Sequence, residues 1–196
     1  MSSENNETRV RILEAALALL EDPAQKNVRM SDIAKRAGIS RQALYLHFKT
    51  RAELLIEATF YFDDLKGTEE QLAPSRAATT GVERLDAYMR AWGAYLPVLY
   101  GIAKAFLLMI ESDEEAKAAW TQRMQDMREG CEAAILALKR DDCLTDLYTV
   151  EEATDLLWTM MSVRNWEQLT QDCGWSAERY TENLILMAEA TFVKKG

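Results

Sequence analysis

Apolar residues recur along most of the chain at intervals of three and four, the spacing that one buried face of an α-helix requires. Helices are therefore expected over about residues 8–21, 50–66, 81–95, 97–111, 113–140, 149–172 and 176–194, with two short ones between residues 30 and 49. No stretch shows the two-residue alternation of a strand. The pattern predicts an all-α protein of about nine helices.

Residues that favour helix ends place most of these boundaries. Pro23 ends the first helix, and Pro97 suits the first position of a new one. Helix starts are indicated by four Ser/Thr-x-x-Glu capping boxes: Thr50/Glu53, Thr80/Glu83, Ser112/Glu115 and Thr149/Glu152. Residues 67–79 are rich in Ser, Thr, Ala and Pro, so they are predicted to form a loop.

The N-terminal residues and the cysteines predict a cytoplasmic protein. Residues 1–8 are polar and do not resemble a signal peptide. We expect them to form a disordered arm. No apolar run reaches the roughly 18 residues of a membrane span. Three widely spaced cysteines give no disulfide framework, and we expect free thiols.

Between Met30 and Leu55 the pattern is that of two short helices joined by a tight turn. Ile33 and Ala37 give the first helix an apolar face, and Gly38 can take the left-handed conformation that ends it. Ser40 is a favoured N-cap for the second helix, which keeps Leu44 and Phe48 for the inside. This arrangement is the helix-turn-helix, whose second helix enters the DNA major groove.

The outer side chains of the second helix suit that role. Arg41 can bind guanine and Gln42 adenine, while the methyl group of Ala43 can meet that of thymine. Residues 23–52 hold seven Lys/Arg, Lys26 among them, and one acid, a balance of +6 on a chain of net charge −9, so the remainder carries −15. A basic segment on an acidic protein predicts phosphate binding.

The run from Arg11 to Leu55, with ILEAALALL, SDIAKRAGIS and ALYLHF, resembles the DNA-binding domain of the TetR family of transcriptional regulators. It departs from the family where Val28 and Arg29 replace a Thr/Ser pair and Arg51 replaces a common lysine, so Arg29 or Ser31 is expected to supply the phosphate contact of that pair. The spacing and the resemblance together give these candidate DNA contacts: Arg29, Ser31, Ser40, Arg41, Gln42, Ala43, Tyr45, Leu46, His47, Lys49 and Arg51.

The last two predicted helices are more apolar than one buried stripe requires. They either pack within the chain or bury themselves against a second subunit. The resemblance favours the second reading, since such regulators pair these helices in a dimer. The expected interface residues are Leu156, Met160, Val163, Leu184, Ile185, Met187 and Ala188.

Aromatic and methionine side chains gather in the middle of the chain. Core packing explains any one of them, but together they resemble the lining of an effector cavity. The candidates are Trp92, Tyr95, Tyr100, Phe106, Met109, Trp120, Met124, Met127 and Trp158. Arg164 is the basic group in an apolar stretch; it pairs with Asp155 or Glu167, or binds an anionic ligand.

Motifs for catalysis, metal binding or a cofactor are missing: His47 is the single histidine, and there is no Gly-rich phosphate loop or nucleophile elbow. The domains expected are a DNA-binding domain over 9–52 and an effector-binding and dimerisation domain over 53–196. The sequence predicts a homodimeric repressor that binds a palindromic operator in double-stranded DNA and leaves it when a small, largely apolar effector binds. The alternatives are a helical adaptor that binds an acidic protein through its basic domain and, with less support, an enzyme.

Overall fold

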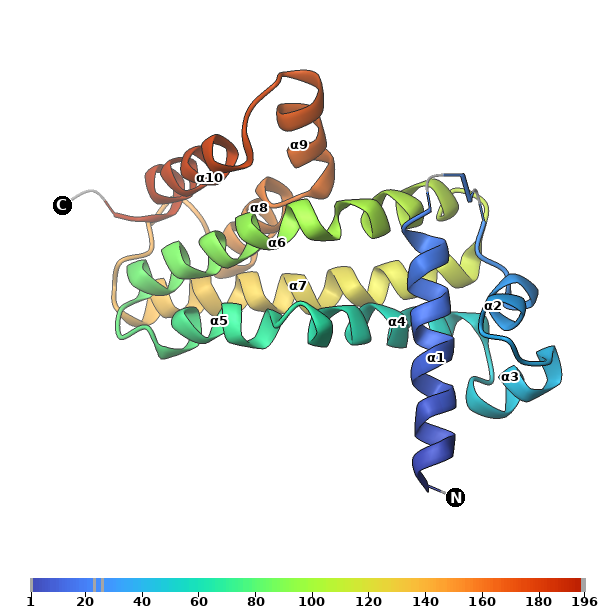
Figure 1. The fold of residues 1–196 in the computed structure, drawn as a ribbon. Helices are drawn as coiled ribbons and strands as arrows, with labels where there is room; N and C mark the ends of the chain where they lie inside the picture. The colour runs from blue at the N-terminus through green and yellow to red at the C-terminus, as the bar shows by residue number, and fades with distance from the viewer. Residues whose placement is uncertain (1, 23, 26, 195–196) are drawn as a thin grey trace. The chain divides into compact units, whose positions relative to one another are not determined.

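A computed structural model describes residues 2–22, 24–25 and 27–194. In this part of the chain the regular elements are α1 (Ser2–Leu20), α2 (Met30–Arg36), α3 (Arg41–His47), α4 (Arg51–Leu65), α5 (Thr68–Ala77), α6 (Gly81–Met109), α7 (Glu114–Arg140), α8 (Val150–Met160), α9 (Val163–Glu167), a π-helical turn (Gln168–Asp172) and α10 (Ala177–Phe192) (Figure 1). The predicted all-α class is confirmed. Pro23 and Lys26, used above as a helix end and as a charge, lie outside the described residues.

The helices group into two compact units. The first contains residues 1–66 and 100–124, and the second residues 67–99 and 125–196. The long helices α6 and α7 each contribute one part to each unit. This grouping follows compactness rather than function, so the domain boundary expected after residue 52 stays a prediction.

In the first unit, α1 packs on α2 and α4, and α2 packs on α3. The helical spacing puts Ile12, Ile33, Leu44 and Phe48 in the shared core, each with 0% of its surface exposed. The predicted disordered arm over residues 1–8 was wrong for residues 2–8, because α1 already begins at Ser2. Residues 5–7 are exposed turns of this helix, and its buried side chains begin at Ile12.

The predicted loop over residues 67–79 was also wrong. α5 occupies Thr68–Ala77 and contains Pro74. An ion pair between Arg76 and Glu69 joins its ends, and the Ser75 hydroxyl donates to the carbonyl oxygen of Arg84, 3.1 Å away. Its glutamate, glutamine, leucine and alanine residues favour a helix, so composition rich in Ser, Thr and Pro was a poor guide here.

Pro97 does not begin a helix, contrary to the prediction, but lies inside the continuous α6. Leu96 and Leu99 on either side are buried, while Pro97 is exposed. Core packing therefore holds the helix together across the proline, and its ring faces solvent. As one helix, α6 is long and apolar enough to cross a membrane by length and composition, but half of that stretch is buried inside the protein, as in a core helix.

The single helix predicted over 149–172 is interrupted after Met160. The Ser162 side chain accepts the backbone N–H of Arg164 at 3.2 Å and begins α9. The Asn165 side-chain amide donates to the carbonyl oxygen of Thr159 at 2.7 Å. Short polar side chains thus replace the helical bonds at this point.

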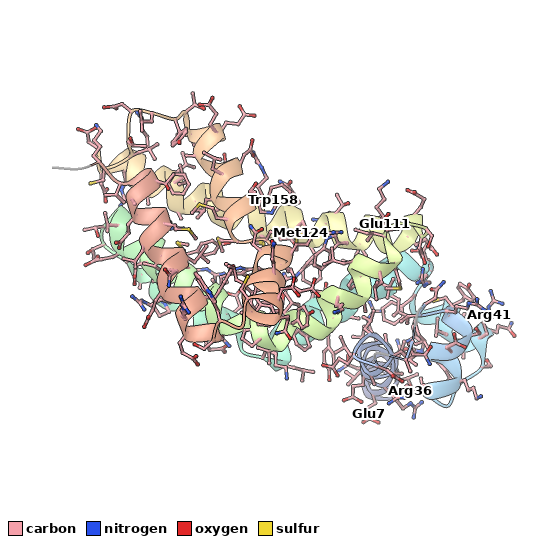
Figure 2. All side chains as sticks on the ribbon, turned by 90° about the horizontal axis from the view of Figure 1, so that it is seen from above. Glu7, Arg36, Arg41, Glu111, Met124 and Trp158 are labelled. Atoms are coloured by element: carbon pink, nitrogen blue, oxygen red, sulfur yellow. The ribbon has the colours of Figure 1, made fainter. Side chains whose placement is uncertain are left out.

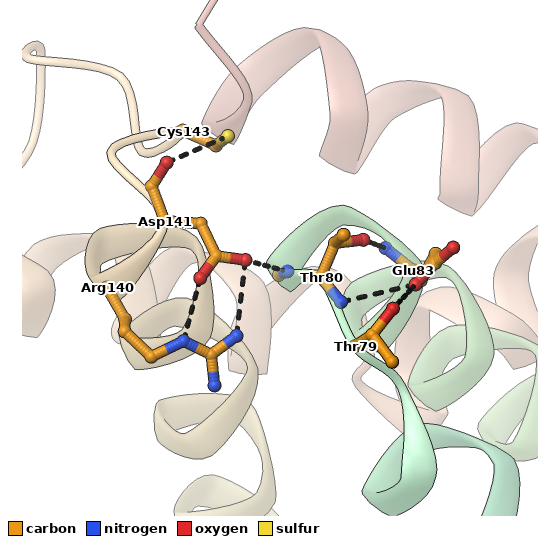
Figure 3. A network of polar contacts seen from close by, with 7 residues as sticks. Thr79, Thr80, Glu83, Arg140, Asp141 and Cys143 are labelled. Atoms are coloured by element: carbon orange, nitrogen blue, oxygen red, sulfur yellow. Dashed lines mark hydrogen bonds and ion pairs between the residues drawn. The ribbon is translucent and has the colours of Figure 1, made fainter.

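In the second unit, α6 lies close against α7 and α10. A Cβ atom on Gly81 would come within 2.5 Å of the backbone nitrogen of Leu138, and one on Gly93 within 2.1 Å of the Thr181 hydroxyl. Asp141, which also pairs with Arg140, accepts the Gly81 N–H at 2.6 Å, while Thr80 and Glu83 form the predicted capping box (Figure 3). Glycine is thus required where α6 begins on α7.

Capping residues agree with the sequence at most other starts. Thr50 and Thr149 each accept the backbone N–H of the glutamate three positions on. At α7 the cap is Asp113 rather than Ser112: its carboxylate accepts the Ala116 N–H at 3.0 Å. That carboxylate has a second partner, described below.

Candidate nucleic-acid interface

The turn between α2 and α3 has the geometry that Gly38 predicted. Gly38 adopts a φ of +68°, in the left-handed region. The Ile39 N–H bonds to the carbonyl oxygen of Ala34 at 3.0 Å and that of Gly38 to Lys35 at 3.3 Å. These two bonds form a Schellman motif, which ends α2 and turns the chain directly into α3.

α3 presents its outer face to solvent. Ser40 caps it by accepting the Ala43 N–H at 3.0 Å, and Arg41 and Gln42 follow as exposed residues of the first turn. Tyr45 and Leu46 are 40% and 85% exposed. Arg36 and Arg41 project from the α2–α3 pair at the surface (Figure 2). The side chains predicted to read bases and to bind phosphate thus lie on one short helix and its neighbour.

Arg41 lies over Tyr45, one helical turn away. Its guanidinium carbon is 5.6 Å from the ring centroid, and Nη2 donates to the tyrosine hydroxyl at 3.4 Å. The ring supports the charged group at the surface without burying it. Both residues were predicted as DNA contacts, and this geometry leaves the arginine accessible.

Arg9 is a supporting residue that the sequence analysis missed. It donates to the carbonyl oxygen of His47 at 2.7 Å, pairs with Glu57, and lies 4.2 Å from the centroid of the Phe48 ring. It satisfies an end carbonyl of α3 and ties that helix to α1 and α4. Its position at the polar beginning of α1 gave no signal of this contact.

The remaining phosphate candidates lie at the surface. Arg29 precedes α2 and makes no side-chain capping bond, and Ser31 and Lys49 are exposed. The Lys49 backbone N–H donates to the Glu53 carboxylate at 2.8 Å, which leaves its ammonium group outside. His47 and Ala43 are half-buried beside them.

Arg51 is the exception, and the structure contradicts its assignment as a DNA contact. Only 8% of this residue is exposed. Its guanidinium donates to the carbonyl oxygen of Val28, to Asp113 at 2.6 Å, to Asn27 at 3.0 Å and to the Met109 sulfur at 3.6 Å. With these partners inside the unit, the group has no free face for a phosphate.

The predicted dimer residues divide into two kinds. Val163, Leu184, Ile185 and Ala188 are at most 5% exposed, so they pack in the core of their own unit and offer almost no surface to a second chain. Leu156 and Met187 are 39% and 45% exposed. Met160 is half-buried, and Leu186, not predicted, is 62% exposed. Exposed apolar side chains therefore remain on both α8 and α10, but they are only partly the ones predicted.

The predicted effector residues also divide. Tyr100, Phe106, Met109, Trp120 and Met124 belong to the first unit, whereas Trp92, Tyr95, Met127, Trp158 and Arg164 belong to the second. Several make core contacts: the rings of Phe106 and Trp120 stack at 5.6 Å, and the Trp92 indole N–H donates to the carbonyl oxygen of Met161 at 2.9 Å. Asp155, one partner suggested for Arg164, pairs with Arg128 at 2.7 Å instead. The exposed Arg164 stays a candidate only.

Known proteins share this helix-turn-helix segment and this fold. Residues 12–58 match the family described as bacterial regulatory proteins, tetR family. Among curated proteins, the transcriptional regulator AcrR of Shigella flexneri is 41% identical over 54 residues, which are 28% of this chain and 25% of AcrR. The chain thus matches about a quarter of that relative's length.

Solved structures extend the likeness of fold to the whole chain. A putative transcriptional regulator from Saccharomonospora viridis, in complex with choline, has a TM-score of 0.74 at 20% identity and covers 97% of this chain and 100% of that one. The SmeT–triclosan complex has a TM-score of 0.69 at 18% identity and covers 97% and 93%. Residues 12–58 of this chain thus match the tetR family of bacterial regulatory proteins, and the chain as a whole shares the fold of these solved structures.

Proposed function

We propose that the chain is a cytoplasmic, homodimeric transcriptional repressor that binds a palindromic operator in double-stranded DNA. The exposed first turn of α3 supports this proposal most directly. Arg41 and Gln42 can reach base edges there, while the buried face of α3 fixes the helix to the rest of its unit. The alternative of a protein adaptor has no comparable feature in its favour.

We also propose that a small, largely apolar effector releases the DNA. Two proteins of the same fold bind choline and triclosan, respectively. This chain carries buried or half-buried aromatic residues in both compact units, such as Trp120 in the first and Trp158 in the second. An effector would act by favouring a conformation in which two reading helices no longer fit successive major grooves.

One experiment tests both parts. The purified protein is incubated with fragmented genomic DNA, bound fragments are sequenced, and the recovered fragment is then titrated in the presence of triclosan or choline. We expect enrichment of a sequence with two-fold symmetry. A ligand that releases the DNA should quench tryptophan fluorescence. Bound DNA must lower the affinity for the ligand by the same factor by which the ligand lowers the affinity for DNA. Recovery of fragments without a common sequence would contradict the repressor.

A further inference from the structure

Arg51 and Asp113 form an ion pair inside the first unit, between the first residue of α4 and the residue that caps α7. Their side chains are only 9% and 15% exposed. Burial acts to raise the pKa of Asp113, but the Ala116 N–H and the Arg51 guanidinium outweigh it and hold the pKa below its ordinary value. The carboxylate is therefore ionised at neutral pH and has a fixed partner on each oxygen.

The same guanidinium also holds the chain that leads into the helix-turn-helix. It donates to the carbonyl oxygen of Val28 and to the Asn27 side chain, just before α2 begins at Met30. Val28 itself is 1% exposed. One planar group thus links the beginning of α2, the beginning of α4 and the beginning of α7, which a lysine with its single nitrogen could not do.

A second ion pair lies farther along the same two helices. Arg123 of α7 pairs with Asp63 of α4 at 2.8 Å, and both side chains are 15% exposed. The arginine lies on α4 in the first pair and on α7 in the second. Because both pairs join the same two helices, a shift of one helix along the other would separate both pairs at once. Figure 1 shows α4 and the first part of α7 side by side.

We propose that Arg51 is a positioning residue for DNA binding: through Asp113 it fixes the beginning of the helix-turn-helix and α4 to the first turn of α7. The proposal rests on the DNA binding proposed above. In this proposal Arg51 does not contact a DNA phosphate. Arg51 affects DNA affinity through the orientation of α2 and α3, so its loss lowers the affinity for every DNA sequence without removing a charge contact to DNA.

The test combines thermal unfolding with the salt dependence of DNA binding in the full-length protein. Arg51→Met and Asp113→Asn should each lower the Tm by roughly 5 °C or more, because each leaves a buried charged or polar partner unpaired. The double variant should lose much less than the sum of the two losses, since the interaction is shared. Additive losses would show that the pair is not coupled and would overturn the proposal.

Arg51→Lys separates positioning from charge. A phosphate contact would survive in the lysine variant, whereas a positioning role would not, so we expect its Tm and DNA affinity to fall toward those of Arg51→Met. This variant also keeps the test valid if Arg51→Met does not fold. Wild-type Tm together with wild-type affinity in Arg51→Lys would contradict the proposal.

The DNA probe is the fragment recovered by the genomic selection, titrated at several salt concentrations. Arg51→Lys and Asp113→Asn should bind it more weakly with an unchanged slope of log affinity against log salt. The matched control is Arg29→Ala, at an exposed position. This variant should keep the wild-type Tm, and its slope of log affinity against log salt should be smaller in magnitude by about 0.9, the contribution of one phosphate contact. A similar loss of slope in Arg51→Met with an unchanged Tm would make Arg51 a phosphate contact. If the wild-type protein binds no DNA, the proposed function fails, while the Tm comparison still decides whether Arg51 and Asp113 are coupled.

Discussion

Arginine has three different roles within the first unit. Arg9 ties the end of α3 to α1 and α4, Arg41 stands at the surface over Tyr45, and Arg51 is enclosed by four acceptors. Arg41 and Arg51 belong to the segment that matches the family and Arg9 lies just before it, yet only burial and partners distinguish the three roles. Exposed arginine is available for DNA, whereas enclosed arginine acts through the protein.

We therefore expect the exposed Arg41 to contribute to the preference of the protein for its operator over random DNA. Arg41→Ala should cost about 1–3 kcal/mol on the selected operator and much less on random DNA, because a bidentate contact to guanine is lost. Fluorescence anisotropy with both duplexes measures this difference. The control is Arg90→Ala on α6, whose guanidinium already pairs with Asp86, and it should change neither affinity. Equal losses on both duplexes would mean that Arg41 only contacts phosphate.

At the scale of elements, two prolines do not end the helices that contain them, whereas one serine caps a helix at a point that the apolar periodicity does not mark. Pro74 and Pro97 lie inside α5 and α6, while Ser162 begins a helix within a stretch of continuous apolar periodicity. Packing of buried neighbours outweighs the cost of a missing helical bond at an exposed proline. Glycines in α6 show the same dependence on surroundings.

Gly93 and Gly101 form a matched pair in α6. A Cβ atom on Gly93 would lie 2.1 Å from the Thr181 hydroxyl oxygen, whereas one on Gly101 would meet nothing within 4 Å. Gly93→Ala should destabilise the protein by about 1–3 kcal/mol through overpacking. Gly101→Ala should stabilise it by about 0.5–1 kcal/mol, since alanine favours the helix. Urea unfolding measures both, and a stabilised Gly93→Ala would show that α6 and α10 do not approach so closely.

For the whole molecule, the exposed apolar side chains on α8 and α10 are our candidates for contact with a second copy of the chain. Leu156, Leu186 and Met187 are each at least 39% exposed, although they belong to helices whose other faces are buried. Burying such side chains against the same surface of another chain would remove them from water and would place two reading helices in one particle.

The double variant Leu156→Glu/Met187→Glu should be a folded monomer with weak operator binding. Charges at exposed positions disrupt an interface but not the core, so the far-ultraviolet circular dichroism should stay that of the wild type. Sedimentation measures the mass. As controls, Leu147→Glu, 78% exposed in the loop after α7, should leave the dimer intact, and Leu184→Glu, 1% exposed, should unfold the chain. A dimer that persists in the double variant would place the interface elsewhere.

The sequence by itself determined the helical class and the helix-turn-helix segment, because both depend on neighbours a few residues apart. Ile33 marks the buried face of α2, and Leu44 and Phe48 mark that of α3, while Gly38 and Ser40 specify the turn and the cap; the structure confirms these local features. Local periodicity also gave α7 and α10 nearly to their ends.

Tertiary structure alone decided which side chains face inward when several faces of a helix are apolar. Leu184 and Met187 look equivalent in the sequence, but one is in the core and the other at the surface. In the same way, Arg51 finds Asp113 and Met109 far away along the chain, and only folding brings these partners together. A buried guanidinium needs acceptors on several sides, and no local pattern can show where distant acceptors will lie.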